Sequence, residues 1–299
     1  MQPSPPFEEI ANRLGASLIS TKQLLGGSSA VVHALGLKMA AGNVEHVVVR
    51  QHRANDFKGH AKTVAQKEFQ VLKRLRRLGF LVPGALLVDE ANAWLVTEWI
   101  EGTTDVAATT LNGALQQMAR FLSSLHCLDP AELALDTLPM LEDPVASIDA
   151  YMPDTAAGLH LGAAIKQGVI QVVANPRRLI HGDYWPGNML WRDGQLGAVI
   201  DWEDAHLGDP LADLAGARIE LKCQYGSHAM DYFTEQYLEA TDLDLTSLPL
   251  WEAYVSSAAL ATMHLWALGQ AEEQQRRTTT TAFFDRAAAE LLDDPTATG

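Results

Sequence analysis

The first hundred residues show a hydrophobic pattern that predicts a small antiparallel sheet. Short runs of β-branched and other apolar residues are separated by turns, as is typical of half-buried strands. We expect five strands, at residues 18–25, 31–37, 47–50, 86–88 and 94–97. A short helix at residues 7–14 is expected to precede them.

The clearest helical pattern lies at residues 62–78, where apolar residues recur at intervals of three and four and Gly79 supplies a stop. Glu68 falls within the apolar stripe. Burying a carboxylate is costly unless a cation meets it, because the charge loses its hydration. Arg50, at the end of the third expected strand, is the natural partner. The pattern therefore predicts an ion pair between Arg50 and Glu68.

From residue 103 onward the pattern predicts mostly helices, at residues 114–126, 159–173, 211–223, 228–240, 249–269 and 279–292. Residues 128–154 contain four prolines and are expected to form a long irregular connection. The expected fold class is α+β with two lobes. A small lobe at residues 1–102 would hold five antiparallel strands and one main helix, and a larger lobe at residues 103–299 would be mostly helical.

One loop in the second part of the chain concentrates acidic and amide side chains. Asp183 is followed five residues later by Asn188, and a proline and a glycine force the chain to turn between them. Two short apolar runs, residues 189–191 and 197–200, then predict a hairpin. Asn188 begins this hairpin and Asp201 follows it, so we expect both residues at one edge.

These side chains are of the kind that phosphoryl transfer requires. A carboxylate must orient the acceptor hydroxyl, and oxygen ligands must hold Mg²⁺ against the phosphates of a nucleotide. Asp183, Asn188 and Asp201 supply that set. Two other interpretations stay open: these residues cap the turns of a buried hairpin, or a hydrolase binds a metal through His181, Asp183, Asp201 and His206.

The spacing closely resembles that of the aminoglycoside phosphotransferase and choline kinase family, which has a protein-kinase-like fold. The resemblance rests on the step from Asp183 to Asn188, on Asp201 after the hairpin, and on later Gly-Asp-Pro and Asp-Leu-Ala segments. It is strongest over residues 179–215. It implies that Asp183 is the catalytic base and that Asn188 and Asp201 bind Mg²⁺. Trp185 stands where many members of the family carry His.

The same resemblance implies a site for ATP or GTP in the small lobe. Arg50 takes the place of the kinase Lys that contacts the α and β phosphates, with Glu68 as its brace. The hinge is expected at residues 97–102, where Glu98 and Ile100 would meet the adenine edge through their backbone. A Gly-rich turn would cover the phosphates with its N–H groups; it consists of Gly26, Gly27, Ser28 and Ser29.

The activity that the resemblance implies is transfer of the γ-phosphate of ATP or GTP to a hydroxyl group of a small molecule. An aminoglycoside, a choline-like amine, a macrolide and a sugar alcohol all remain open as acceptors. A nucleotide-binding pseudokinase that lacks turnover is the alternative from another functional class. A protein kinase is disfavoured because the chain lacks an Ala-Pro-Glu segment after Asp201.

The net charge of −15 counts against a nucleic-acid partner, which would require a basic face. Residues 1–79 carry 12 Lys and Arg against 5 Asp and Glu, whereas the remaining residues carry 10 against 32. The basic part suits the phosphates of a nucleotide, and the acidic part would attract a cationic acceptor.

Neither a secretion signal nor a long apolar run is visible, so we expect a cytoplasmic protein without a membrane anchor. The sequence carries no signal for a monomer or a dimer.

Three polar residues are expected to have structural roles. Asp209 precedes Pro210 and a predicted helix, so it is interpreted as the N-cap. His181 is expected to hold the loop in place. His126, at the end of the helix predicted at residues 114–126, is expected to pack in the core.

Overall fold

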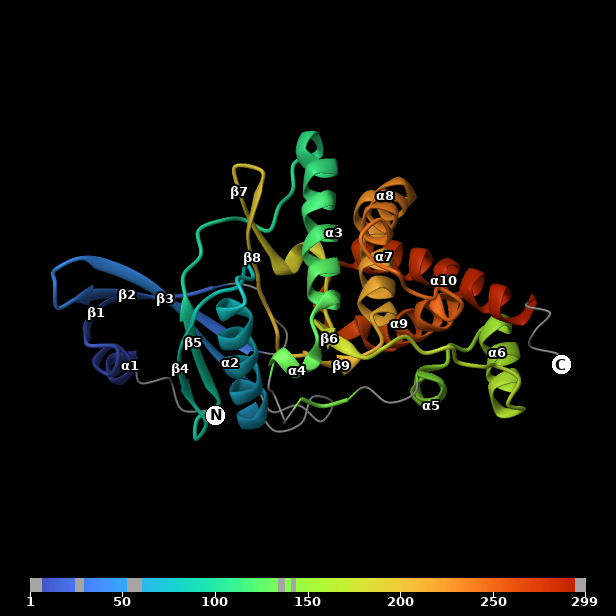
Figure 1. The fold of residues 1–299 in the computed structure, drawn as a ribbon, viewed down its shortest axis with the longest axis horizontal. Coiled ribbons are helices and arrows are strands. Elements are labelled where there is room, and N and C mark those ends of the chain that lie inside the picture. The colour runs from blue at the N-terminus through green and yellow to red at the C-terminus, as the bar shows by residue number, and fades with distance from the viewer. Residues whose placement is uncertain (1–6, 25–29, 53–60, 134–137, 141–143, 294–299) are drawn as a thin grey trace. The chain divides into compact units, whose positions relative to one another are not determined.

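The computed structural model describes residues 7–24, 30–52, 61–133, 138–140 and 144–293. The chain forms two compact units (Figure 1). Unit 1 comprises Met1–Thr103, Leu190–Arg192 and Gly197–Asp204, and unit 2 comprises Thr104–Met189, Asp193–Leu196 and Ala205–Gly299.

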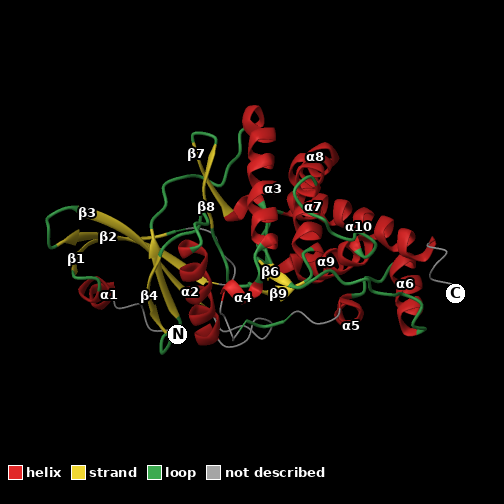
Figure 2. Ribbon diagram, in the orientation of Figure 1, coloured by secondary structure: helices red, strands yellow, loops and turns green. Residues whose placement is uncertain are grey.

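Unit 1 is built on the five-stranded antiparallel sheet that the hydrophobic pattern predicts (Figure 2). The strand order is β1-β2-β3-β5-β4. The strands are β1 (Ala16–Gln23), β2 (Ala30–Met39), β3 (Val44–His52), β4 (Ala85–Asp89) and β5 (Trp94–Glu98), and the helices are α1 (Phe7–Arg13) and α2 (Ala61–Arg77). Helix α1 packs against β1, and α2 packs against β3, β4 and β5. Each expected strand and both expected helices of this part of the chain are confirmed.

The side chains of β3 point alternately to the two faces of the sheet, and this alternation determines which of them meet the charged residue of α2. Val47 and Val49 are buried in an apolar core with residues of α1, β2 and β5. Successive side chains of a strand point to opposite faces, so Arg50 and His52 share the other face. Glu68 of α2 meets both of them there. The strand pattern thus places a guanidinium and an imidazole side by side beside a buried carboxylate.

A β-hairpin follows the loop at residues 181–188, as expected, with strands β7 (Met189–Arg192) and β8 (Gln195–Val199). The end of the expected hinge pairs with this hairpin. The backbone N–H of Thr103 donates to the carbonyl of Trp191 at 2.9 Å, and that of Trp191 donates back at 2.8 Å. A Cβ atom on Gly102 would lie 2.9 Å from the Trp191 carbonyl oxygen. Only glycine permits so close an approach of the two backbones.

Unit 2 is mostly helical, as predicted. Its helices are α3 (Leu111–Cys127), α4 (Pro130–Leu133), α5 (Pro144–Ile148), α6 (Ala156–Lys166), α7 (Leu211–Tyr225), α8 (Ser227–Leu238), α9 (Leu248–Thr262) and α10 (Gln270–Asp293), with 3₁₀ turns η1 (Ala108–Thr110), η2 (Asp149–Tyr151), η3 (Pro186–Asn188) and η4 (Met263–Leu265). Two short strands, β6 (Arg178–Ile180) and β9 (His206–Gly208), pair in antiparallel fashion. Helices α4 and α5 and turn η2 fall within the connection that was expected to be irregular.

Two of the predicted helices end earlier than expected. The helix expected at residues 159–173 ends at Lys166, because Gly168 adopts a φ of 70° and the N–H of Gly168 bonds back to the carbonyl of Ile165. The helix expected at residues 249–269 ends at Thr262 and gives way to η4.

Helix α10 begins nine residues before the expected start at residue 279. Its first turns carry no apolar stripe, and ion pairs one turn apart support them instead. Arg276 lies 3.5 Å from Glu272, and Arg277 lies 2.8 Å from Glu273. Such pairs stabilise a helix without leaving a hydrophobic signal.

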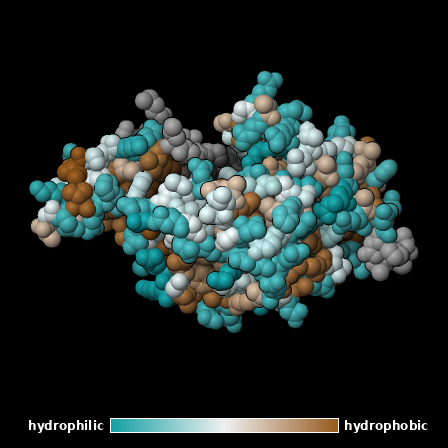
Figure 3. All heavy atoms as spheres, turned by 90° about the horizontal axis from the view of Figure 1, so that it is seen from above, coloured by the Kyte–Doolittle hydropathy of each residue, from teal (hydrophilic) through white to brown (hydrophobic). Residues whose placement is uncertain are grey.

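Hydrophilic and hydrophobic residues are interspersed over the face of the molecule that Figure 3 shows. Within the described part of the chain, no helix is both long enough and apolar enough to span a bilayer. Both cysteines, Cys127 and Cys223, are free thiols.

Candidate active site

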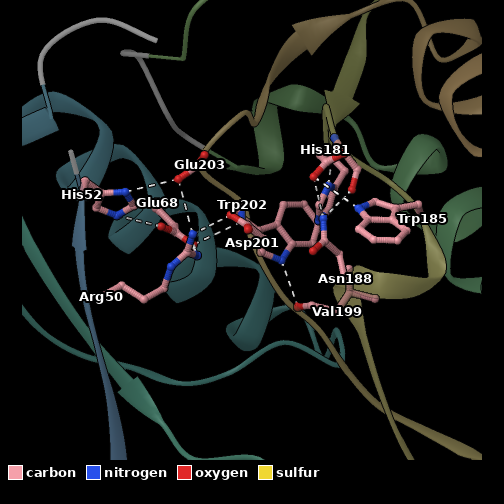
Figure 4. Close-up of polar contacts among 11 residues, drawn as sticks. Arg50, His52, Glu68, His181, Trp185, Asn188, Val199, Asp201, Trp202 and Glu203 are labelled. Atoms are coloured by element: carbon pink, nitrogen blue, oxygen red, sulfur yellow. Dashed lines mark hydrogen bonds and ion pairs between the residues drawn. The ribbon is translucent and has the colours of Figure 1, made fainter. Parts of the chain in front are cut away.

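Arg50 is the centre of a charged cluster in unit 1 (Figure 4). Its Nη1 donates to Glu68 Oε1 at 2.5 Å, and its Nη2 donates to Asp201 Oδ1 at 2.6 Å. The same Nη2 lies 3.3 Å from Glu203 Oε2. His52 approaches Glu68 Oε2 at 3.1 Å through Nε2 and Glu203 Oε2 at 3.3 Å through Nδ1. The predicted pair of Arg50 and Glu68 is present, and two further groups, His52 and Glu203, complete a cluster that the sequence did not reveal.

The cluster holds three carboxylates against one guanidinium and one imidazole. Glu68 and Glu203 are almost fully buried, with side chains 1% and 3% exposed, whereas Asp201 is 25% exposed. Burial alone would raise the pKa of Glu68, but Arg50 and His52 outweigh it and lower that pKa overall. Burial alone would lower the pKa of His52, but Glu203 and Glu68 outweigh it and raise that pKa. Each buried charge is therefore stabilised by a partner within the cluster.

Asp201 adopts a backbone conformation that is unusual for a residue with a side chain, with a φ of 67°. Such conformations cost free energy and cluster at functional sites. The next residue anchors the segment: the N–H of Trp202 donates to Glu68 Oε1 at 3.2 Å, and its indole Nε1 donates to the carbonyl of Val199 at 3.0 Å. Burial is the main cause that raises the pKa of Asp201, and Arg50 opposes it. The fold thus holds the Asp201 carboxylate in one direction.

The expected hinge borders a cavity of about 580 Å³ in unit 1. Glu98 and Ile100, the two hinge residues predicted to meet the adenine edge, both line it. Trp99 also lines it, and its ring centroid lies 6.4 Å from that of His46. Glu98 itself is anchored, because its Oε2 accepts the N–H of Gly84 at 3.0 Å. The Gly-rich turn of Gly26, Gly27, Ser28 and Ser29 lies outside the described residues.

The loop at residues 181–188 in unit 2 brings Asp183 and Asn188 together. Asn188 Nδ2 donates to both the backbone carbonyl and the carboxylate Oδ2 of Asp183, each at 2.8 Å. Trp185 Nε1 donates to the same Oδ2 at 3.3 Å. The N–H of Asp183 donates to His181 Nδ1 at 3.2 Å, and the hydroxyl of Tyr184 donates to the carbonyl of Met118 at 2.8 Å. The loop is therefore tied to itself and to α3.

Asp213, near the start of α7, fixes the beginning of this loop. Its Oδ2 accepts the N–H of His181 at 2.7 Å, and its Oδ1 accepts the N–H of Gly182 at 2.8 Å. The carboxylate is 1% exposed. Burial would raise the pKa of Asp213, but hydrogen bonding and the charge of nearby His126 outweigh it and lower the pKa overall. A buried carboxylate that accepts two backbone N–H groups is a rigid anchor.

His126 does more than pack in the core. Its Nε2 lies 3.2 Å from Asp213 Oδ2, and its Nδ1 lies 2.7 Å from the hydroxyl of Tyr237. A chain of buried polar groups thus runs from α8 through α3 to Asp213 and the loop. The sequence placed His126 on the buried side of its helix and did not reveal these partners.

The interpretation that Asp209 caps α7 is confirmed. Pro210 directly precedes the helix and already has helical backbone angles, and the capping side chain comes from Asp209. Its Oδ1 accepts the N–H of Leu211 at 2.9 Å, and its Oδ2 accepts the N–H of Asn175 at 2.9 Å. Asp209 therefore joins the start of the helix to the segment before β6, which is a structural role.

Asn188 and Asp201 each present an oxygen atom of the kind that a hard divalent cation binds. Both hydrogen bonds from Asn188 to Asp183 use the amide nitrogen of Asn188, and the amide oxygen of Asn188 takes part in neither bond. Asp201 is part-exposed and presents a carboxylate. Mg²⁺ prefers such oxygen ligands and usually keeps several waters. Within the described ranges, no group of three or more His, Cys, Asp or Glu side chains is placed to hold a metal ion.

Comparison with models of protein families gives a match over most of the chain. A model described as the phosphotransferase enzyme family matches residues 21–254. The chain belongs to this family. The matched range includes Arg50, Glu68, Asp183 and Asn188, and it extends past Asp201 into the helical end of the chain.

Several solved structures share the fold. The macrolide 2'-phosphotransferase MphH from Brachybacterium faecium is 18% identical, with 92% of this chain and 97% of that chain covered and a TM-score of 0.63. The choline kinase LicA from Streptococcus pneumoniae is 19% identical, with 95% and 96% covered and a TM-score of 0.61. An aminoglycoside phosphotransferase in ternary complex with AMP-PNP and hygromycin B is 17% identical, with 94% and 98% covered and a TM-score of 0.64. A search of curated proteins by sequence found no match. The predicted resemblance and the two-lobed kinase-like fold are confirmed.

Proposed function

We propose that this family member transfers the γ-phosphate of ATP or GTP to a hydroxyl group of a small molecule, with Mg²⁺ as the metal. The observation that carries the proposal is the pairing of Arg50 with both Glu68 and Asp201. In kinases a strand Lys pairs with a helix Glu, and the acid after the hairpin holds Mg²⁺. Here Arg50 and Glu68 form the corresponding pair, and Asp201 lies beside it. The complexes of related enzymes with AMP-PNP support the choice of nucleotide.

In this proposal residues 1–102 form the nucleotide-binding lobe and residues 103–299 form the catalytic and acceptor-binding lobe. Glu98 and Ile100 border an open depression in the surface of unit 1. The turn of Gly26, Gly27, Ser28 and Ser29, which lies outside the described residues, would cover the phosphates in this proposal.

Arg50 neutralises phosphate charge with its planar fork of donors, and Glu68 holds the fork in place. When bound, ATP and Mg²⁺ would supply the phosphoryl group and neutralise the charge that develops on it. Asn188 would hold the ion through its amide oxygen, and Asp201 through its carboxylate.

Asp183 accepts the proton of the acceptor hydroxyl as the hydroxyl oxygen forms its bond to the γ-phosphorus. The bond between that phosphorus and the leaving nucleoside diphosphate breaks in the same transfer. Asn188 fixes the orientation of the carboxylate through its two hydrogen bonds. Asp213 holds the backbone before it. A base that is positioned in this way needs no rearrangement before it acts.

The acceptor in this proposal is a cationic small molecule. The excess of acidic residues after residue 79 would attract such a molecule. A related aminoglycoside phosphotransferase binds hygromycin B, and another neighbour is a choline kinase.

Asp183→Asn tests the proposed base. The amide keeps an oxygen that can accept from Asn188 and Trp185 but cannot take a proton, so turnover should fall by about 10²–10⁴-fold. Calorimetric titration with Mg-ATP should give the same affinity for the variant and the wild type. Near-normal turnover in Asp183→Asn would show that another group removes the proton. Nucleotide binding without turnover by the wild type, across a panel of amino alcohols, aminoglycosides, macrolides and sugars, would favour a pseudokinase.

A further inference from the structure

Trp185 contacts the proposed catalytic carboxylate directly. Its indole Nε1 donates to Asp183 Oδ2 at 3.3 Å, the same oxygen that accepts from Asn188 Nδ2 at 2.8 Å. Neither of these bonds uses Asp183 Oδ1. Both donors therefore bind the same carboxylate oxygen, Oδ2, and together they restrain the orientation of the carboxylate.

The loop holds the Trp185 ring in a defined position. A Cβ atom on Gly187 would clash with three atoms of the six-membered ring, so the ring lies directly over the glycine backbone. Any larger residue at position 187 would displace it. Exposure alternates along the segment: Tyr184 is buried, whereas Asp183 is exposed and Trp185 is part-exposed. The carboxylate and the indole thus emerge on the same side of the loop.

We propose that Trp185 has two roles in the transfer: its N–H orients the Asp183 carboxylate, and its ring contacts a positively charged group of the acceptor. The inference rests on the proposed function, because it takes Asp183 as the group that meets the acceptor hydroxyl. Trp185 is then a positioning residue through its N–H and a specificity residue through its ring.

The chemistry of the indole supports the second role. The face of an aromatic ring carries negative charge density, and Trp attracts a cation more strongly than Tyr or Phe. An acceptor whose hydroxyl reaches Asp183 must pass close to this ring. An ammonium group a few bonds from the hydroxyl would then meet both the ring and the nearby carboxylate. A neutral molecule of the same shape would gain neither attraction.

Three variants separate the two roles. Trp185→Phe keeps an aromatic face and removes the N–H donor. Trp185→His keeps a ring N–H and reduces the face. Trp185→Leu removes both and keeps a bulky apolar side chain.

Binding of matched probes tests the contact with charge, without any need for turnover. The first pair is choline and its uncharged isostere 3,3-dimethylbutan-1-ol, and the second is hygromycin B and its N-acetylated form. Each is titrated calorimetrically in the presence of Mg²⁺ and AMP-PNP. We expect the wild type to prefer the charged member of at least one pair by about tenfold. Trp185→Phe should retain most of this preference, and Trp185→Leu should lose it.

The positioning role is read from kinetics with the acceptor that the wild type phosphorylates best. The value of kcat should fall in Trp185→Phe and Trp185→Leu and recover in Trp185→His, while KM for ATP stays constant in all three. A charge preference that survives in Trp185→Leu, or that is absent from the wild type in both pairs, would overturn the contact. Equal kcat values in all variants would overturn the positioning role. Charge-selective binding without phosphoryl transfer to any acceptor would instead refute the proposed function and leave the contact standing.

Discussion

Removing the guanidinium of Arg50 should destabilise the protein strongly. In Arg50→Met the carboxylates of Glu68 and Glu203, whose side chains are 1% and 3% exposed, lose the cation that they share. Breaking a buried ion pair by removing one partner typically costs about 3–5 kcal/mol. His52 still contacts both carboxylates, so we expect about 3 kcal/mol, the lower end of that range. Asp201 is 25% exposed and adds less, because water can reach it.

Arg50→Lys separates charge from geometry. A lysine keeps the positive charge but has no planar fork, so it cannot serve Glu68 and Asp201 in the same way. Loss of one hydrogen bond between charged groups should cost about 2 kcal/mol. Urea unfolding followed by circular dichroism, together with thermal melting, measures both variants. The matched control is Arg13→Met, whose pair with Asp89 spans 3.4 Å and is partly exposed, and which should change stability by less than about 1 kcal/mol.

The pH dependence provides a second check on the same variant. Folding lowers the pKa of Glu68 from its ordinary value of 4.5. The ionised carboxylate of Glu68 therefore stabilises the folded protein above pH 4.5, and this stabilisation is lost as the pH falls through the lowered pKa. The deficit of Arg50→Met relative to the wild type should therefore shrink in acid. If Arg50→Met unfolds like Arg13→Met at pH 7, Arg50 does not stabilise the buried carboxylates and the reasoning fails.

Two further variants test the anchors in unit 2. In Asp213→Asn the side chain cannot accept both backbone N–H groups of the loop. The variant protein should therefore lose about 3 kcal/mol of stability in urea unfolding and most of its turnover. Unchanged turnover would show that the loop does not depend on this anchor. Glu252, 1% exposed, accepts from Arg218 at 2.7 Å and from Arg286 at 2.5 Å. Glu252→Gln leaves Arg218 without its buried counter-charge, so the free energy of unfolding should fall by about 3–5 kcal/mol, with KM for ATP unchanged. A melting temperature equal to that of the wild type would contradict this expectation.

The sheet and the main helix of the first unit were predictable because their signals are local. The strand at residues 47–50 is a β-branched run, and α2 repeats its apolar residues at helical spacing. That spacing placed Glu68 on the buried face, and the rarity of an unpaired buried charge pointed to Arg50. The start of α10 could not be found in this way, since ion pairs and not apolar residues support its first turns.

The partners of the candidate site were harder to predict because they come from distant parts of the chain. Arg50 and Glu203 are separated by 153 positions, and no local pattern relates them. His52 did carry a signal, since it lies two residues after Arg50 and a strand places both on one face. The bonds of Trp185 and His126 depend on loop geometry and helix packing, which residue type alone does not specify. Sequence spacing thus predicted the candidate site residues, and the fold supplied the groups that contact them.

The most direct test of the proposed activity is mass spectrometry of an acceptor panel after incubation with Mg-ATP and the wild-type protein, with Asp183→Asn in parallel. We expect that at least one acceptor gains one phosphoryl group and that one ADP forms for each phosphorylated acceptor molecule. Asp183→Asn should yield almost no product. The account would be contradicted if calorimetry shows that Mg-ATP binds the wild type while every acceptor in the panel keeps its original mass.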